Sequence, residues 1–220
     1  MTVNTEKQLV VLMHGIAQPR IIMSGLAEFM EDSGYAVLNL SYPSTDKTID
    51  RLTGEIHKKL VHHDAFNAFD QIHFVTHSMG GLVARAYIER HRPPNLGRVV
   101  MMGPPNKGSE VADLLKDIWF YKAFFGPAGQ ELTTESRAPY GDHPVDFELG
   151  VIAGTSAVMS MFGPASVGPN DGLVTVESTK LPGMADHMTV PAAHAFIMNN
   201  PAARRGILSF LKDGHFPKLH

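Results

Sequence analysis

The sequence contains no cysteine, a single tryptophan and no marked excess of either charge. Without cysteine the chain has no disulfide framework, no thiolate metal site and no cysteine nucleophile. The 19 basic and 22 acidic side chains leave a formal net charge of −3. That balance provides no basic surface for nucleic acid, so we expect no nucleic-acid partner. At 44% hydrophobic and 19% charged residues, the chain is globular rather than a disordered tail or a coiled coil.

Long hydrophobic runs are also missing. The uninterrupted apolar stretches are short, as in Leu9 to Met13, whereas a membrane-spanning helix needs about 20 apolar residues. We therefore expect no transmembrane segment. A secretory signal would place a longer apolar region and a small-residue cleavage site near the N-terminus. The sequence has neither, and this favours the cytoplasm.

The motifs that hold nucleotides or metals do not occur either. The chain lacks the glycine-rich phosphate loops G-x-x-x-x-G-K-[ST] and G-x-G-x-x-G, and it lacks H-E-x-x-H. His62, His63 and Asp64 are consecutive, and consecutive side chains at a helix end point apart, so we interpret them as solvated surface. We expect neither a cofactor nor a metal ion.

Apolar runs rich in β-branched residues alternate with segments of helical periodicity, which is typical of βαβ units. The pattern predicts an α/β fold with a mainly parallel central sheet and helices on both faces. At about 100–200 residues per domain, the 220 residues are expected to form one domain, 1–220. The predicted strands are 9–13, 35–40, 71–76, 98–102, 148–154 and 187–190. The predicted helices are 21–32, 49–61, 82–90 and 195–212, the last broken or restarted at Pro201.

The alternation stops between about residues 104 and 146, where prolines, glycines and aromatic residues are frequent. We interpret this segment as a cap-like insertion, because about 40 residues cannot build a core of their own. Its aromatic side chains either pack the insertion onto the body or line an acyl pocket, and the two roles are compatible. The candidate pocket residues are Trp119, Phe120, Phe124 and Phe125.

Ser78 stands where a predicted strand changes abruptly into a helix, with Gly80 and Gly81 directly after it. This is the arrangement of a nucleophile elbow, in which a tight turn presents a serine hydroxyl above the strand ends. The usual pattern is G-x-S-x-G, and Thr76 stands in place of its first glycine. The alternative is a serine that merely caps a helix.

A serine hydroxyl becomes a nucleophile only beside a base that a carboxylate holds in place. In this fold the partners are expected in the order Ser, acid, His. Asp171 lies in a turn-forming segment at the right place in that order, although an Asx-turn without a catalytic role would also explain it. His194 follows the last predicted strand, whereas His187 stands at its start, directly before Met188 to Val190, and would lie at the opposite end of the sheet. We therefore assign the base to His194.

An oxyanion hole requires backbone N–H groups that face the developing negative charge. The N–H of Met79, directly after the serine, is one candidate. The second is the N–H of Ile16, in the loop after the first strand, where Gly15 permits unusual backbone angles. We interpret the His14 side chain as structural.

With these pieces in place, the sequence resembles the α/β-hydrolase superfamily, and within it the small serine esterases and lipases of the GPI-inositol-deacylase-like branch. The resemblance implies cleavage of a carboxylic ester, in a small-molecule or lipid substrate, through a serine acyl-enzyme. It spreads over about residues 9–212 and is carried by 12–15 (LMHG), 75–81 (VTHSMGG), 102–110 (MGPPNKGSE), 170–174 (NDGLV) and His194.

Two alternatives remain open at this point. The same triad would serve an acyltransferase whose acceptor is an alcohol or amine instead of water. A ligand-binding protein could also keep the fold without turnover, because one fold hosts many functions. The presence of a serine, an aspartate and a histidine in the required order argues against a pure binder.

Overall fold

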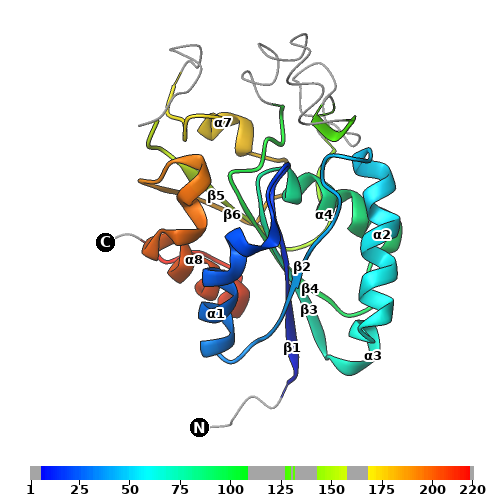
Figure 1. Cartoon of the computed structure of the whole chain (residues 1–220). Helices are drawn as coiled ribbons and strands as arrows, with labels where there is room; N and C mark the ends of the chain where they lie inside the picture. The colour runs from blue at the N-terminus through cyan, green and yellow to red at the C-terminus, as the bar shows by residue number, and fades with distance from the viewer. Residues whose placement is uncertain (1–5, 109–126, 130, 132–142, 158–167, 219–220) are drawn as a thin grey trace, which may run out of the picture.

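The computed structural model describes residues 6–108, 127–129, 131, 143–157 and 168–218. Within them, one six-stranded sheet has the order β2-β1-β3-β4-β5-β6, and every neighbouring pair is parallel (Figure 1). The strands are β1 (Gln8–Met13), β2 (Ala36–Leu40), β3 (Gln71–His77), β4 (Leu96–Met102), β5 (Leu149–Gly154) and β6 (Asp186–Val190).

Helices cover both faces of this sheet, with α1 and α8 on one face and α2 and α4 on the other (Figure 1). The predicted fold class is therefore confirmed. The helical segments are η1 (Arg20–Met23), α1 (Ser24–Asp32), α2 (Ile49–His62), α3 (Ala65–Ala68), α4 (Met79–His91), α7 (Val176–Thr179), η2 (His194–Asn199) and α8 (Pro201–Asp213).

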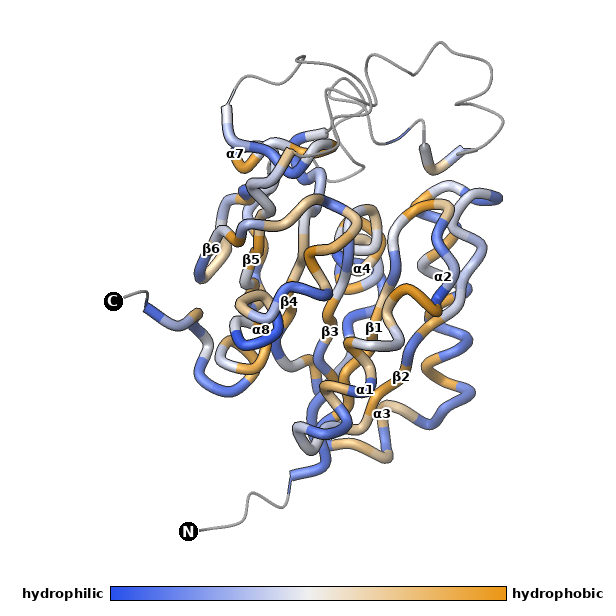
Figure 2. Tube along the Cα trace, turned by 60° about the vertical axis from the view of Figure 1, so that its left-hand side comes forward, coloured by the Kyte–Doolittle hydropathy of each residue, from blue (hydrophilic) through white to orange (hydrophobic). Residues whose placement is uncertain are grey.

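The apolar run of β1 is explained by burial on two sides. Val11 and Met13 pack into the cluster under α2 and α4, whereas Val10 and Leu12 pack into the cluster under α1 and α8. A parallel strand covered on both faces has no solvent side, so it reads as a continuous hydrophobic run. Figure 2 shows the hydrophobic stretches concentrated along the strands, with hydrophilic residues on the outer turns of the helices.

The predicted closing helix 195–212 is two elements instead of one. Segment η2 ends at Asn199, and α8 begins at Pro201, so the proline restarts the helix. Asn200 caps this start, because its Oδ1 accepts the N–H groups of Ala202 and Ala203 at 2.8 and 3.2 Å. A proline at the first helical position loses no hydrogen bond, since that N–H has no partner within the helix.

The carboxyl ends of all six strands meet at one edge of the sheet, the upper edge in Figure 1. Strands β2 and β3 lie on opposite sides of β1. The chain therefore goes from β1 to β2 on one side, then passes β1 to form β3 on its other side, so the strand order reverses at β1. In open parallel sheets, ligands bind outside the carboxyl ends of the strands at such a switch point. The loops after β1 and β3 therefore frame the expected place for a site.

Strand β4 contains one residue more than β3 between the pairs Ile72–Leu96 and Phe74–Val99. The N–H of Arg98 in this irregular stretch donates to His73 Nδ1 at 2.8 Å. His73 is only 1% exposed, and burial, followed by the charge of Arg98, lowers its pKa to about 4. Protonation of Nδ1 would also destroy the bond from Arg98. The fold therefore holds this histidine neutral.

Most of the insertion predicted between residues 104 and 146 lies outside the described residues, as do all four candidate pocket residues Trp119, Phe120, Phe124 and Phe125. The helices in the described part of the chain include none with the length and apolar character that crossing a bilayer requires.

His73 makes the stability depend on pH. The unfolded chain binds a proton at this histidine below about pH 6.5, whereas the folded protein does not until about pH 4, so stability falls as the pH drops between these values. At pH 5 the loss is about 2 kcal/mol. His73→Asn keeps an acceptor for the Arg98 N–H but cannot titrate. We expect urea unfolding at pH 7 and 5 to show a loss smaller by about that amount in the variant.

Replacement of the exposed His62 by Asn is the control, and it is expected to leave the pH dependence of unfolding as in the wild type. An equal loss of stability from pH 7 to 5 in the wild type and in His73→Asn would contradict a buried neutral His73.

Candidate active site

Ser78 joins β3 to α4 with a strained backbone. Its φ is 54° and its ψ is −129°, and α4 begins with the next residue, Met79. A positive φ is uncommon outside glycine and is retained only where the surroundings enforce it. Here the Ser78 N–H donates to the carbonyl of Met102 at 2.9 Å, and the Ser78 carbonyl accepts the N–H of Gly81 at 3.0 Å. The turn has the geometry of a nucleophile elbow.

Gly80 allows the first turn of α4 to approach the end of β1. A Cβ at this position would lie 2.6 Å from the carbonyl oxygen of Met13 and 2.7 Å from that of His14. Real Cβ atoms do not come so close to backbone, so glycine is required here. Thr76, which replaces the first glycine of the usual pattern, is fully buried inside β3, with its Oγ1 3.5 Å from the carbonyl of Val100.

The structure brings together the three side chains predicted to act on one another. His194 Nε2 lies 2.9 Å from Ser78 Oγ, and His194 Nδ1 lies 2.7 Å from Asp171 Oδ2. A carboxylate oxygen accepts, so Nδ1 carries the proton, and Nε2 accepts the serine hydroxyl. Asp171 is 2% exposed and His194 6% exposed. The bonded row therefore runs from a buried carboxylate to a hydroxyl at the strand edge.

The two oxygens of Asp171 have different partners. Oδ1 accepts the N–H groups of Leu173 and Val174 at 3.0 and 2.8 Å and so forms the turn, whereas Oδ2 bonds His194. The Asx-turn considered from the sequence and the contact with histidine are thus both present. The N–H of His194 also donates to the carbonyl of Asp171 at 2.9 Å. Backbone and side chain together hold the imidazole at one orientation to the carboxylate.

His187, the competing histidine, lies elsewhere. It belongs to β6 and is half-buried, and its Nε2 is 3.1 Å from Thr179 Oγ1. Residue His194 instead follows β6 and opens η2, at the edge where Ser78 lies. Of the two histidines, the structure places His194 beside the serine.

The loop after β1 lies against the serine. A Cβ on Gly15 would be 3.1 Å from the Cβ of Ser78. The N–H of Gly15 donates to Gln18 Oε1, and that of Ala17 to Ser44 Oγ, both at 3.1 Å. The Ile16 N–H between them makes no hydrogen bond to any described residue.

The N–H of Met79 belongs to the first turn of α4, where backbone N–H groups have no partner within the helix. Met79 follows Ser78 directly, and Ile16 follows Gly15, the residue of the β1 loop that lies against Ser78.

His14 supports this loop from within. Its ring is buried and stacks on Tyr42, with 4.3 Å between ring centroids and 11° between ring planes. Its Nδ1 lies 2.8 Å from the carbonyl of Gly15, and the hydroxyl of Tyr42 donates to the carbonyl of His14. Both interactions lock the backbone next to Ser78.

A residue that the sequence did not single out also touches this site. His77, directly before the serine, is fully buried, with its Nε2 2.9 Å from the carbonyl of His194 and its Nδ1 3.1 Å from Gln18 Oε1. Burial, followed by the neighbouring His194, lowers the pKa of His77 to about 3. The only hint in the sequence was a histidine at the end of a buried strand.

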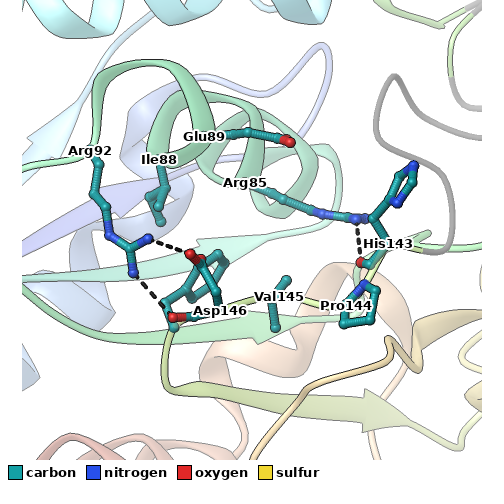
Figure 3. Close-up of a pocket in the computed structure, with 9 residues that line it drawn as sticks. Arg85, Ile88, Glu89, Arg92, His143, Pro144, Val145 and Asp146 are labelled. Carbon is teal, nitrogen blue, oxygen red and sulfur yellow. Dashed lines mark hydrogen bonds and ion pairs between the residues drawn. The ribbon is translucent and has the colours of Figure 1, made fainter.

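Among the described residues a pocket of about 320 Å³ lies along α4, away from Ser78 (Figure 3). Arg92 bonds Asp146 through Nη1 at 2.7 Å, and Arg85 Nη2 donates to the carbonyl of His143 at 2.8 Å. Because α4 starts at the serine, these arginines lie about 10–20 Å along the helix from it. Both contacts fasten the chain before β5 to α4.

No group of three or more His, Asp or Glu side chains within the described ranges is placed to hold a metal ion.

The sheet order, the elbow and the bonded row of side chains are those of an α/β-hydrolase. The sequence matches the palmitoyl protein thioesterase family over residues 9–137, more than half of the chain. The chain belongs to this family. The comparison with curated proteins gives no match.

Several solved structures share the fold. The mature lipase BlEst2 of Bacillus licheniformis is 21% identical, with a TM-score of 0.73 and coverage of 97% of this chain and 94% of that one. The metagenomic carboxyl esterase MGS0156 is 18% identical, with a TM-score of 0.68 and coverage of 89% and 66%. The RedJ thioesterase of Streptomyces coelicolor is 14% identical, with a TM-score of 0.62 and coverage of 96% and 86%.

Gly103, after β4, supplies a test of how closely the site is packed. Its φ is +56°, and a Cβ there would lie 3.1 Å from Asp171 Oδ2, 3.2 Å from His194 Cε1 and 3.0 Å from Ile197 Cδ1. Gly34 is the matched control, because its φ is +93° and a Cβ there would meet nothing within 4 Å. The backbone strain from alanine is about 1–2 kcal/mol at either position.

At Gly103 crowding adds a further loss of about 1–3 kcal/mol. We therefore expect the free energy of unfolding in urea to fall more in Gly103→Ala than in Gly34→Ala. Equal losses in the two variants would mean that the neighbourhood of Asp171 and His194 is looser than the structure has it.

Proposed function

We propose that this protein is a serine hydrolase that cleaves carboxylic esters through an acyl-enzyme. The observation that carries the proposal is the unbroken row of hydrogen bonds from Asp171 through His194 to Ser78, at 2.7 and 2.9 Å. A serine hydroxyl without a base is a poor nucleophile, and a base without a fixed tautomer accepts the proton poorly. The site meets both needs.

In the first half-reaction Ser78 Oγ bonds to the ester carbonyl carbon while its proton passes to His194 Nε2. Asp171 stabilises the imidazolium through the bond at Nδ1. The tetrahedral intermediate then expels the alcohol oxygen, which takes the proton from Nε2, and the acyl group stays on the serine. The bonds from Leu173 and Val174 to Asp171 keep the carboxylate in place throughout.

The negative charge on the carbonyl oxygen requires donors that are already in position. The backbone N–H groups of Ile16 and Met79 serve this role in our proposal, which is supported by the contact of the Gly15 loop with Ser78 and by the position of Met79 directly after it. Donors fixed by the fold need no reorganisation at the moment of reaction, and one such donor contributes about 3–4 kcal/mol to the barrier reduction.

In the second half-reaction a water molecule gives a proton to His194 Nε2 and attacks the acyl carbon. The bond to Ser78 Oγ breaks, the serine regains a proton and the acid leaves. If an alcohol or amine takes the place of this water, the same steps give acyl transfer. Product analysis with competing acceptors distinguishes the two.

Membership of the palmitoyl protein thioesterase family favours a second substrate class, the thioesters. A thioester and an oxyester with the same acyl chain present the same carbonyl to Ser78 and differ in the leaving group. Parallel assays with such pairs, in increasing chain length, separate the classes. The likeness of the motifs to the GPI-inositol-deacylase-like branch supports lipid esters as substrates and remains part of this proposal.

Ser78→Ala removes the nucleophile. We expect kcat/KM for a short-chain p-nitrophenyl ester to fall by at least about 10⁴-fold, because the remaining groups cannot form the acyl-enzyme. The variant should fold normally, as circular dichroism would check. A fluorophosphonate probe should label the wild type and leave Ser78→Ala unlabelled. Undiminished turnover in the variant, or an unlabelled wild type that only binds ligands, would end the proposal.

The two histidines are separated by paired substitutions. His194→Ala should lose at least about 10³-fold in kcat, since no other base lies within hydrogen-bond distance of Ser78 Oγ among the described residues. His187→Ala removes a side chain bonded to Thr179 and should retain turnover close to that of the wild type. The reverse result, with His187 essential and His194 dispensable, would show that the base is misassigned.

A further inference from the structure

His77 lies between two parts of the chain that are far apart in sequence. One side of its ring faces the carbonyl of His194, 117 positions further on, at 2.9 Å, and the other faces the side chain of Gln18 at 3.1 Å. The rings of His77 and His194 are 4.8 Å apart, centroid to centroid. Because His77 is also bonded covalently to Ser78, it is adjacent to the nucleophile and to the base at once.

The ring of His77 is neutral over the range in which enzymes work, since burial holds its pKa far below neutrality. It therefore carries one proton for two polar neighbours. The backbone carbonyl of His194 can only accept, and it is the closer of the two neighbours, whereas Gln18 Oε1 already has a donor in the N–H of Gly15. The proton accordingly belongs on Nε2, where it bonds the carbonyl of His194.

The two loops that His77 connects follow strands that are far apart in the sheet. The loop of Gly15 and Ile16 follows β1, and His194 follows β6, and three strands lie between these two strands in the sheet. At about 4.8 Å per strand the two loops start about 19 Å apart. They converge on Ser78, and Gln18, whose Oε1 also accepts the Gly15 N–H at 3.1 Å, meets His77 there.

We propose that His77 is a positioning residue for the reaction: its Nε2–H holds the backbone carbonyl of His194 and thereby fixes the distance from the base to Ser78. This inference rests on the proposed function. This hydrogen bond fixes the backbone of His194, while the hydrogen bond from Nδ1 to Asp171 Oδ2 orients its imidazole ring. Displacement of a catalytic group by about 1 Å can cost about 100-fold in rate.

The first test needs no variant. Long-range ¹H–¹⁵N correlation spectra of the wild type distinguish the two neutral tautomers of a histidine. We expect His77 to give the pattern of a ring protonated at Nε2, unchanged from pH 8 to 6. A ring protonated at Nδ1 would donate to Gln18 instead, and would overturn the proposal.

The second test compares two replacements of similar shape. In His77→Gln the side-chain NH2 reaches the place of Nε2 and keeps a donor for the carbonyl of His194, whereas in His77→Asn the amide ends at the place of Nδ1 and leaves that carbonyl without one. We expect kcat to fall about 10–100-fold in the asparagine variant and to recover largely in the glutamine variant. KM should stay the same in both, because His77 does not touch substrate.

His73→Asn is the matched control, since it replaces another buried histidine of β3 by the same residue, away from Ser78. It should lower stability and leave kcat unchanged. Wild-type kcat in both His77 variants, or equal losses in the two at matched folded fractions, would refute the role of the Nε2 bond. A wild type that neither hydrolyses esters nor reacts with fluorophosphonate would instead refute the proposed function itself.

Discussion

The left-handed backbone of Ser78 is the constraint on which the rest of the site depends. A residue with a side chain adopts this conformation only where the surrounding structure enforces it. Here the hydrogen bond from the Ser78 N–H to the carbonyl of Met102 and the start of α4 at the next residue enforce it. The turn is possible because Gly80 lets the helix touch the end of β1. The cost of the strain, about 1–3 kcal/mol, is offset by a core buried on both faces of the sheet. The strained turn projects the Ser78 hydroxyl beyond the end of β3.

Around that hydroxyl the fold holds several side chains by more than one contact. Asp171 divides its two oxygens between its own turn and His194, and the backbones of these two residues are bonded as well. His14 is stacked on a buried tyrosine. Groups that are held in this way have already lost their conformational freedom before a substrate arrives, so the reaction does not have to order them. The rigidity of the sheet edge is therefore part of the proposed chemistry.

The sequence predicts the strands and the choice of His194 over His187, but it leaves the break at Pro201 undecided and does not predict the contacts of His77. Strand runs buried on both faces are continuous and easily recognised, and once their order is known, chain direction alone separates His194 from His187. The break at Pro201 stayed open because an asparagine cap and a helix interruption look alike in sequence. The contact of His77 with Gln18 and His194 depends on packing between segments 59 and 117 positions apart, about which local periodicity carries no information.

The extra residue near the start of β4 has a consequence for insertions and deletions in this chain. It sets the register of β4 against β3, and this register places the carbonyl of Met102, about 13 Å further along the strand, where the Ser78 N–H can donate to it. Loss of one residue there would turn each later side chain of β4 to the opposite face of the sheet. It would also shift the carbonyl that holds the serine turn. An insertion or deletion near the start of β4, far from the candidate site, would thus alter the backbone that holds Ser78, because a strand transmits a register shift along its whole length.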